Sequence, residues 1–241
     1  MIEHKGIAAF LLLTFGLTFA YEGCLIATGL SVNLGLSPDT PAPPAYVALL
    51  IGLVMWVPTL STFIVVKFIT KEGFASTMLR LGPLKPFLAS ALIIPACFLI
   101  IYALTWLLGL GAPDWRLEHV RRTAASFGID TATMPDSRIL LPLIFVASLA
   151  LGPTVNGVFG FGEELGWRGY LLPKLMPLGK WRAYIVLGMI WGFWHAPLIL
   201  AGLNYPGYPI LGVVAMMGMT TTLGIYINEM TLRYRSAILA G

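Results

Sequence analysis

Two short clusters of polar residues interrupt the apolar stretches of this 241-residue sequence. In the first, G-F-G-E-E-L-G-W-R, Glu163 and Glu164 are adjacent and Arg168 follows. Residues four apart share a helix face, so Glu164 and Arg168 are expected to pair, while Glu163 points about 100° away. A buried carboxylate that keeps no cationic partner is suited to act as a general base toward water. The alternative is a structural ion pair, because the E-x-x-x-R spacing is common on helices.

The second cluster is W-G-F-W-H-A-P, in which Trp191 and His195 are four residues apart. Pro197 cannot donate a backbone hydrogen bond, so we expect the helix to bend here and to free carbonyl groups. A lone histidine in an apolar stretch is usually a packing residue. His195 is nevertheless the one histidine in the predicted membrane core, because His4 is terminal and His119 lies in a loop.

Three further residues in apolar segments are assigned structural roles. Glu22 lies in the last third of the first apolar run, and we favour a structural role for it, as a snorkelling or an interhelical hydrogen-bonding residue. Cys24 and Cys97 belong to no C-x-x-C pair, and we expect both to be buried, inert thiols rather than disulfide partners or metal ligands.

The composition identifies the environment that must hold these residues. Apolar residues make up 58% of the sequence and charged residues 11%, whereas a soluble domain carries about 25% charged residues. This excludes a soluble globular enzyme and a disordered chain. The net charge of +4 is too small for a nucleic-acid-binding face, so no nucleic-acid partner is expected. A multi-pass integral membrane protein with the lipid bilayer as partner remains.

The apolar runs predict an all-α, polytopic transmembrane helix bundle that forms a single membrane-embedded domain over residues 1–241. A spanning helix needs about 20 mostly apolar residues. Six full spans are expected, and the segment SAILAG at 236–241 resembles the start of a seventh. The six are 6–27, 45–66, 87–110, 139–162, 183–201 and 210–228. Glycines around the first cluster should let helices approach closely; they are Gly152, Gly157, Gly160, Gly162, Gly166 and Gly169.

The loop charges predict that the N-terminus is cytoplasmic. Basic residues concentrate between spans two and three, between spans four and five, and after span six, which the positive-inside rule places in the cytoplasm. They are Lys67, Lys71, Arg80, Lys85, Arg168, Lys174, Lys180, Arg182, Arg233 and Arg235. The first external loop carries only Asp39, and the loop between spans five and six carries no charge. The loop between spans three and four fits the rule less well, because it has four arginines on the predicted outer side, offset by four acidic residues. They are Arg116, Arg121, Arg122 and Arg138, with Asp114, Glu118, Asp130 and Asp136. The membrane is either a prokaryotic plasma membrane or the endoplasmic reticulum, and short loops and termini favour the prokaryotic one.

The two clusters together resemble the motifs of the CPBP family of intramembrane proteases. This family includes the Rce1-like CAAX prenyl protease 2 and the Abi proteins. The first motif is present as E-E-L-G-W-R, and the second, usually F-x-x-x-H, is present with Trp191 as its aromatic residue. Residues 139–241 carry this motif region.

The resemblance implies an intramembrane endopeptidase with a cavity that opens toward the cytoplasmic face. Glu163 would activate the attacking water, and His195 would position it or stabilise the oxyanion. Glu164, Arg168 and Trp191 would support the site. CAAX-like, prenylated or other small peptides would be the substrates. The resemblance equally allows a non-catalytic membrane protein of the same family, acting in bacteriocin immunity or as a scaffold. A transporter is disfavoured, because spans two, three and six are almost free of ionisable groups.

Two points qualify the expected chemistry. The family has a further motif, H-x-x-x-N, after the stretch that SAILAG resembles, and no histidine follows His195 here. Either the chain is truncated at Gly241 or the protein lacks that part of the site, and the second case favours the non-catalytic alternative. Although the family has often been described as metalloproteases, a catalytic zinc needs about three protein ligands. The sequence offers His195, two carboxylates and no H-E-x-x-H helix, so no cofactor is expected and a metal is disfavoured.

Overall fold

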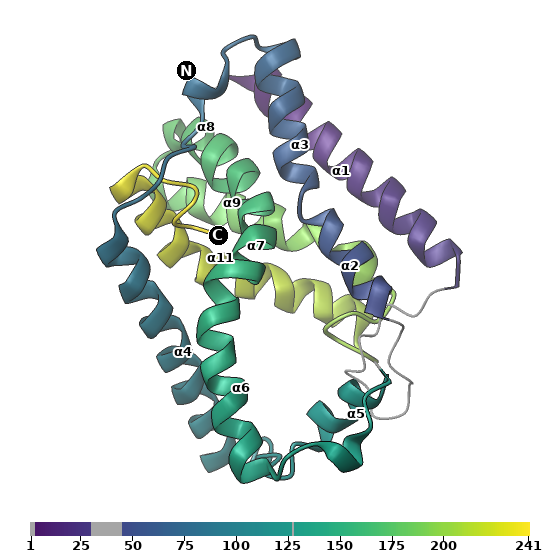
Figure 1. The fold of residues 1–241 in the computed structure, drawn as a ribbon. Coiled ribbons are helices and arrows are strands. Elements are labelled where there is room, and N and C mark those ends of the chain that lie inside the picture. Colours follow the sequence, from purple (N-terminus) through teal and green to yellow (C-terminus); the bar gives the residue numbers. More distant parts are fainter. Residues whose placement is uncertain (1–2, 30–44, 127) are drawn as a thin grey trace. The chain divides into compact units, whose positions relative to one another are not determined.

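A computed structural model describes residues 3–29, 45–126 and 128–241 of the chain, and every regular element within these ranges is a helix (Figure 1). The chain divides into two compact units. The first comprises Met1–Leu81 and Val158–Gly241, and the second comprises Gly82–Gly157. The expected all-helical class is confirmed for the described residues, and the two units are considered separately.

The first unit begins with one long helix and a broken pair. Helix α1 spans His4–Ala27, and α2, Ala45–Val54, leads into α3, Val57–Ile64. Pro58 lies in the first turn of α3, a position where its missing N–H breaks no helical hydrogen bond. A π-helical turn, η1, continues α3 over Val65–Ile69. Figure 1 shows α1 beside α2 and α3, and the phenol of Tyr21 donates to Leu50 O at 3.1 Å.

The rest of the first unit carries both predicted motifs. Its helices follow one another with short connections, and the longest of them, α11, lies along α9 (Figure 1). They are α7 (Gly157–Glu164), η5 (Leu165–Leu171), α8 (Leu172–Leu175), η6 (Met176–Leu178), α9 (Lys180–Trp194), α10 (Ala196–Leu200) and α11 (Pro209–Tyr234). The predicted break between the fifth and sixth apolar runs is confirmed, because the chain turns between Leu200 and Pro209.

Glycines allow α9 and α11 to approach closely. A Cβ on Gly188 would lie 2.5 Å from Thr221 Cα, and one on Gly192 would lie 2.4 Å from Met217 Cα. Thr220 on α11 donates to the Gly188 carbonyl at 2.8 Å. Small residues four apart on one helix thus face the backbone of the next, the usual way that helices pack where both are apolar.

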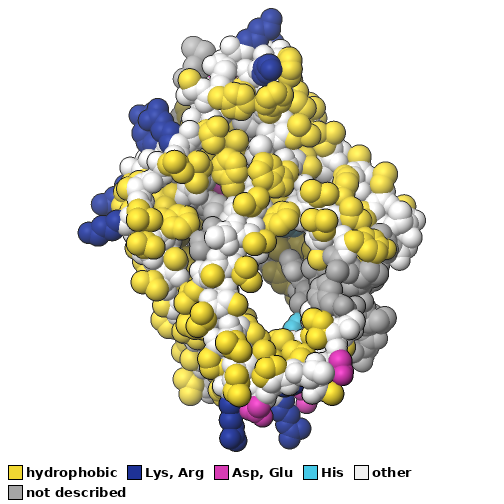
Figure 2. All heavy atoms as spheres, viewed as in Figure 1, with side chains coloured by type: hydrophobic (Ala, Val, Ile, Leu, Met, Phe, Trp, Pro, Cys, Tyr) yellow, Lys and Arg dark blue, Asp and Glu magenta, His cyan; other side chains and the backbone are white. Residues whose placement is uncertain are grey.

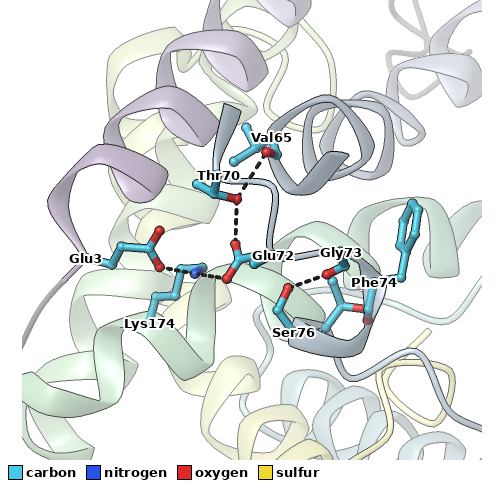
Figure 3. A network of polar contacts seen from close by, with 9 residues as sticks. Glu3, Val65, Thr70, Glu72, Gly73, Phe74, Ser76 and Lys174 are labelled. Atoms are coloured by element: carbon cyan, nitrogen blue, oxygen red, sulfur yellow. Dashed lines mark hydrogen bonds and ion pairs between the residues drawn. The ribbon is translucent and has the colours of Figure 1, made fainter. Parts of the chain in front are cut away.

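An ion-pair cluster ties the start of α1 to the first unit (Figure 3). The ammonium of Lys174 on α8 contacts Glu3 and donates to Glu72 Oε2 at 2.9 Å. Thr70, at the end of η1, donates to the other oxygen of Glu72 at 2.9 Å. Lys174 therefore joins the N-terminal end of α1 to the segment that follows η1.

The second unit contains two long helices and a polar segment. Helix α4 spans Leu84–Leu107 and α6 spans Ser137–Leu151, followed by the π-helical turn η4, Gly152–Asn156. Between α4 and α6 lie α5, Glu118–Ser126, and a short 3-10 turn, η3. The side chain of Asp136 caps α6 by accepting from the Arg138 N–H at 2.9 Å.

Among the described residues, four helical stretches are long and apolar enough to cross a membrane. They are His4–Ala27, Tyr46–Ile69, Leu84–Leu107 and Pro209–Tyr234, and a fifth span results if Ser137–Leu151 and Thr154–Leu178 are counted together. The structure therefore supports a multi-pass membrane protein but not the full count of six. The predicted span 183–201 is divided at His195, which leaves α9 with 15 residues. Residues 236–241 form a turn rather than the start of a seventh helix.

Two details of the sequence interpretation change. Cys24 and Cys97 are free, as expected, but both are exposed rather than buried. Arg168, counted among the loop charges, is fully buried. The first external loop with Asp39 lies outside the described residues.

The visible surface agrees with a membrane environment. Figure 2 shows hydrophobic side chains over most of this face and few charged ones. Large apolar residues of α4 point outward, among them Leu92 and Leu99 with 68% and 62% of their surface exposed. Such exposure of long apolar helices is typical of a lipid-facing surface.

Candidate active site

The two adjacent glutamates lie where an α-helix changes to a π-helix. Helix α7 ends at Glu164 and η5 begins at Leu165. Single π-helical turns inside longer helices are frequently found at functional sites. Both carboxylates are buried, with Glu163 6% and Glu164 4% exposed. Their side chains leave the helix in different directions, because each contacts a different partner.

The second glutamate forms the predicted ion pair. Arg168 Nη1 donates to Glu164 Oε1 at 2.7 Å. The guanidinium also donates from Nε to Asn228 Oδ1 on α11, at 3.2 Å. Charge-assisted hydrogen bonds of this kind are needed to keep a buried guanidinium and carboxylate stable. The pair thereby fixes η5 against α11.

Trp191 on α9 connects the first glutamate to this ion pair. Its indole Nε1 donates to Glu163 Oε2 at 2.7 Å. The face of the same ring lies 3.9 Å from the guanidinium carbon of Arg168, a cation–π contact. One side chain therefore orients Glu163 and covers the Arg168–Glu164 pair.

His195 stands at the predicted break between α9 and α10. Its backbone N–H bonds to Gly192 O at 3.2 Å rather than to Trp191 O, and Pro197 has no N–H to offer Phe193 O. The carbonyl of Trp191 is thus left for the His195 ring, whose Nδ1 lies 2.9 Å from it. Because that nitrogen is engaged with a carbonyl acceptor, Nε2 is the nitrogen with an available lone pair.

The structure therefore brings all five predicted site residues into one cluster within the first unit. Trp191 contacts Glu163 and Arg168 through its side chain and His195 through its carbonyl. Sequence reasoning missed Asn228, which is 1% exposed and binds Arg168. An uncharged amide at the end of an apolar run was the available signal, and it was interpreted only as the end of a span.

Within the described residues, the cluster offers few side chains that could bind a metal ion. Among the described residues, no group of three or more His, Cys, Asp and Glu side chains is placed to hold a metal ion. Glu164 is committed to Arg168, which leaves Glu163 and His195, fewer than the roughly three ligands that a catalytic zinc requires. The expected absence of a cofactor stays a prediction.

Comparison with known proteins supports the resemblance. Residues 138–240 match the family described as Type II CAAX prenyl endopeptidase Rce1-like. This part of the chain is therefore similar to the Rce1-like family. A curated relative, the CAAX prenyl protease 2 of Methanococcus maripaludis, is 27% identical over 184 residues, which cover 58% of this chain and 68% of the relative. The family predicted from E-E-L-G-W-R and Trp191-x-x-x-His195 is thereby confirmed, and the matched Rce1-like segment contains the whole cluster.

Proposed function

We propose that this chain is an intramembrane endopeptidase in which Glu163 activates a water molecule for attack on a peptide bond. The observation that carries the proposal is the bridging position of Trp191, which joins Glu163, Arg168 and His195 in one buried cluster. An ion pair with a purely structural role would require only Glu164 and Arg168. It gives no reason for a second carboxylate to be held separately by an indole N–H.

In the proposed reaction the two glutamates have different roles, Glu163 as the base and Glu164 as a structural residue. Glu163 takes one proton from water as the water oxygen bonds to the carbonyl carbon, and the carbonyl π electrons move to its oxygen. His195 stabilises that oxyanion or orients the water. When the C–N bond breaks, the carbonyl re-forms and the proton held by Glu163 passes to the leaving amine. Glu164 remains paired with Arg168 and keeps η5 in place.

The comparisons and the membrane setting support a proposed substrate class. Both matches name a CAAX prenyl protease, so a farnesylated peptide ending in Cys-aliphatic-aliphatic-X is the first substrate to test. A lipidated chain end would reach the site from the bilayer that surrounds the apolar helices. We place the site near the cytoplasmic face of a prokaryotic plasma membrane, in accordance with the loop charges.

Glu163→Gln is the first test. The amide still accepts the Trp191 N–H but cannot take a proton from water, so cleavage of the farnesylated peptide should fall at least about 1,000-fold. Glu118→Gln is the matched control, because it removes an exposed glutamate of α5. Both proteins should insert and purify like the wild type. Normal cleavage by Glu163→Gln refutes the role of Glu163 as the base, and absence of cleavage by the wild type leaves a non-catalytic family member as the function.

A further inference from the structure

The buried ion pair of the site is joined at one point only. Arg168 Nη1 donates to Glu164 Oε1 at 2.7 Å, whereas a guanidinium and a carboxylate can form two parallel hydrogen bonds. Arg168 Nη2 and Glu164 Oε2 are buried and have no hydrogen-bond partner within the part of the chain that the structure describes. Unpaired polar atoms of buried charged groups are costly, so we expect a further polar partner at this point.

Other parts of the guanidinium are already in contact with protein groups. Asn228 Oδ1 accepts from Arg168 Nε at 3.2 Å, and the ring of Trp191 lies 3.9 Å from the guanidinium carbon. Because Nε can only donate, the amide oxygen of Asn228 is the atom that faces it, and the amide nitrogen points elsewhere. Among the described residues, Nη2 is the guanidinium nitrogen that is left without a partner.

Gly224 leaves room beside this nitrogen. It lies one turn before Asn228 on α11, and both residues are buried. A Cβ on Gly224 would lie 3.5 Å from Arg168 Nη2 and 3.9 Å from Asn228 Nδ2. Apart from the backbone of α11 and the two adjacent residues, no other atom of the described residues lies within 4 Å of that position. Two nitrogen donors therefore lie beside a position that the side chain of any residue but glycine would fill.

A water molecule has the size and the chemistry that this position requires. It can accept from Arg168 Nη2 and donate to Glu164 Oε2, and buried waters usually make about three such bonds to otherwise unpaired groups. Two hydrogen bonds of about 2.8 Å through one water span up to about 5.5 Å. That reach suits two groups that are already joined by one direct hydrogen bond. A cation would be repelled by Arg168 and an anion by Glu164, so a neutral molecule is favoured.

We propose that η5 and α11 hold a buried water molecule beside Gly224, bound to Arg168 Nη2, Glu164 Oε2 and the amide of Asn228. This water completes the ion pair and fixes the guanidinium that the ring of Trp191 covers. It is distinct from the water that attacks the peptide bond.

The bound water gives Gly224 and Asn228 a positioning role. Trp191 contacts the guanidinium with its ring and donates to Glu163 from the same indole. A guanidinium that is held in place therefore helps to hold the indole, and the indole orients the carboxylate. This role in catalysis rests on the proposed function, whereas the water site does not.

Thermal unfolding in detergent tests the water site with Gly224→Ala. The added methyl group makes an ordinary contact with Arg168 Nη2 rather than a clash, but it takes the position of the water and leaves two buried polar atoms unpaired. Although alanine favours a helix over glycine, the unfolding temperature should fall by several degrees. Gly218→Ala in the same helix is the control, because no atom lies within 4 Å of its added Cβ. If Gly224→Ala unfolds at the temperature of Gly218→Ala, the proposed water is refuted.

A crystal structure of the wild type that resolves ordered water gives a direct readout. One oxygen atom should lie within hydrogen-bonding distance of both Arg168 Nη2 and Glu164 Oε2. It should be missing from Gly224→Ala. The absence of this oxygen from the wild type, or a protein group in its place, overturns the proposal, and this result is decisive even if Gly224→Ala does not fold.

Cleavage of the farnesylated peptide separates the water site from its role in catalysis. Gly224→Ala should lower kcat by about tenfold or more with little change in KM, because Glu163 is less well oriented, while Gly218→Ala should match the wild type. An unchanged kcat in Gly224→Ala overturns the positioning role. If Glu163→Gln cleaves normally, the proposed function of Glu163 fails, and the crystal structure alone still decides whether the water is bound.

Discussion

At the scale of single residues, Trp191 determines how the two motifs meet. The family's second motif usually carries phenylalanine at this position, which would leave the ring over Arg168 but offer no hydrogen-bond donor. Here the indole N–H reaches Glu163 at 2.7 Å. The substitution of tryptophan for phenylalanine therefore adds a polar contact to the residue proposed as the general base, and it changes more than the size of the ring.

Trp191→Phe isolates that contact. It keeps an aromatic ring beside Arg168 and leaves the backbone carbonyl that His195 contacts. A hydrogen bond to a charged group contributes about 1.5–3 kcal/mol to stability. We therefore expect a lower unfolding temperature, together with a fall of kcat/KM by about tenfold or more. Trp181→Phe, at an exposed tryptophan of the same helix, is the matched control. Equal activity of the two variants would show that the indole N–H does not orient Glu163.

At the scale of secondary structure, glycines set the distance between α3 and the helix that carries the glutamates. A Cβ on Gly162 would lie 2.8 Å from Met55 O, and one on Gly166 would lie 2.4 Å from Pro58 Cβ. Thr59 on α3 donates to Gly162 O at 2.7 Å. These contacts hold α7 and η5 against α3 along the turn that contains Glu163, so their loss should displace the site.

Gly166→Ala is predicted to destabilise the protein. Alanine favours a helix over glycine by up to about 1 kcal/mol, but the clash with Pro58 should outweigh this and cost about 1–3 kcal/mol. Gly16→Ala in α1 is the control, because no atom lies within 4 Å of its added Cβ, and it should be neutral or stabilising. Thermal unfolding in detergent measures both. If the two variants unfold at the same temperature, α3 and η5 do not pack as described.

The features that the sequence predicted correctly are those that depend on residues close together along the chain. The pair of Glu164 and Arg168 follows from their spacing on a helix, and the break at His195 follows from Pro197. The bond from Trp191 to Glu163 joins residues 28 positions apart, and that from Arg168 to Asn228 spans 60. Such contacts depend on how helices pack, which one sequence does not specify. The burial of Arg168 and the exposure of the cysteines were misjudged for the same reason.

At the scale of the whole molecule, membrane orientation decides from which side a substrate can reach the site. The loop charges predict a cytoplasmic N-terminus and a cytoplasmic segment around Lys71. By alternation of the predicted spans, the segment around His119 is then expected outside. Helix α4 lies between these two segments along the chain, and Cys97 is exposed near its middle. If α4 spans the membrane, this thiol is exposed to lipid rather than to water.

Thiol labelling tests orientation and span together, with a Cys24→Ser variant in which Cys97 is the single thiol. A thiol in hydrocarbon is neutral, and a charged maleimide cannot reach it, so Cys97 should label only after denaturation.

In a variant lacking both native cysteines, His119→Cys should label in intact cells of a bacterial host. Lys71→Cys should label in inverted vesicles. Because the Asp114 carboxylate accepts from the backbone N–H of residue 119 at 3.0 Å, His119→Cys keeps that contact. The opposite labelling pattern would reverse the orientation, and rapid labelling of Cys97 would show that α4 does not lie in the bilayer. Labelling as predicted would place the basic segments on the side from which the proposed substrate, a cytosolic prenylated peptide, would approach.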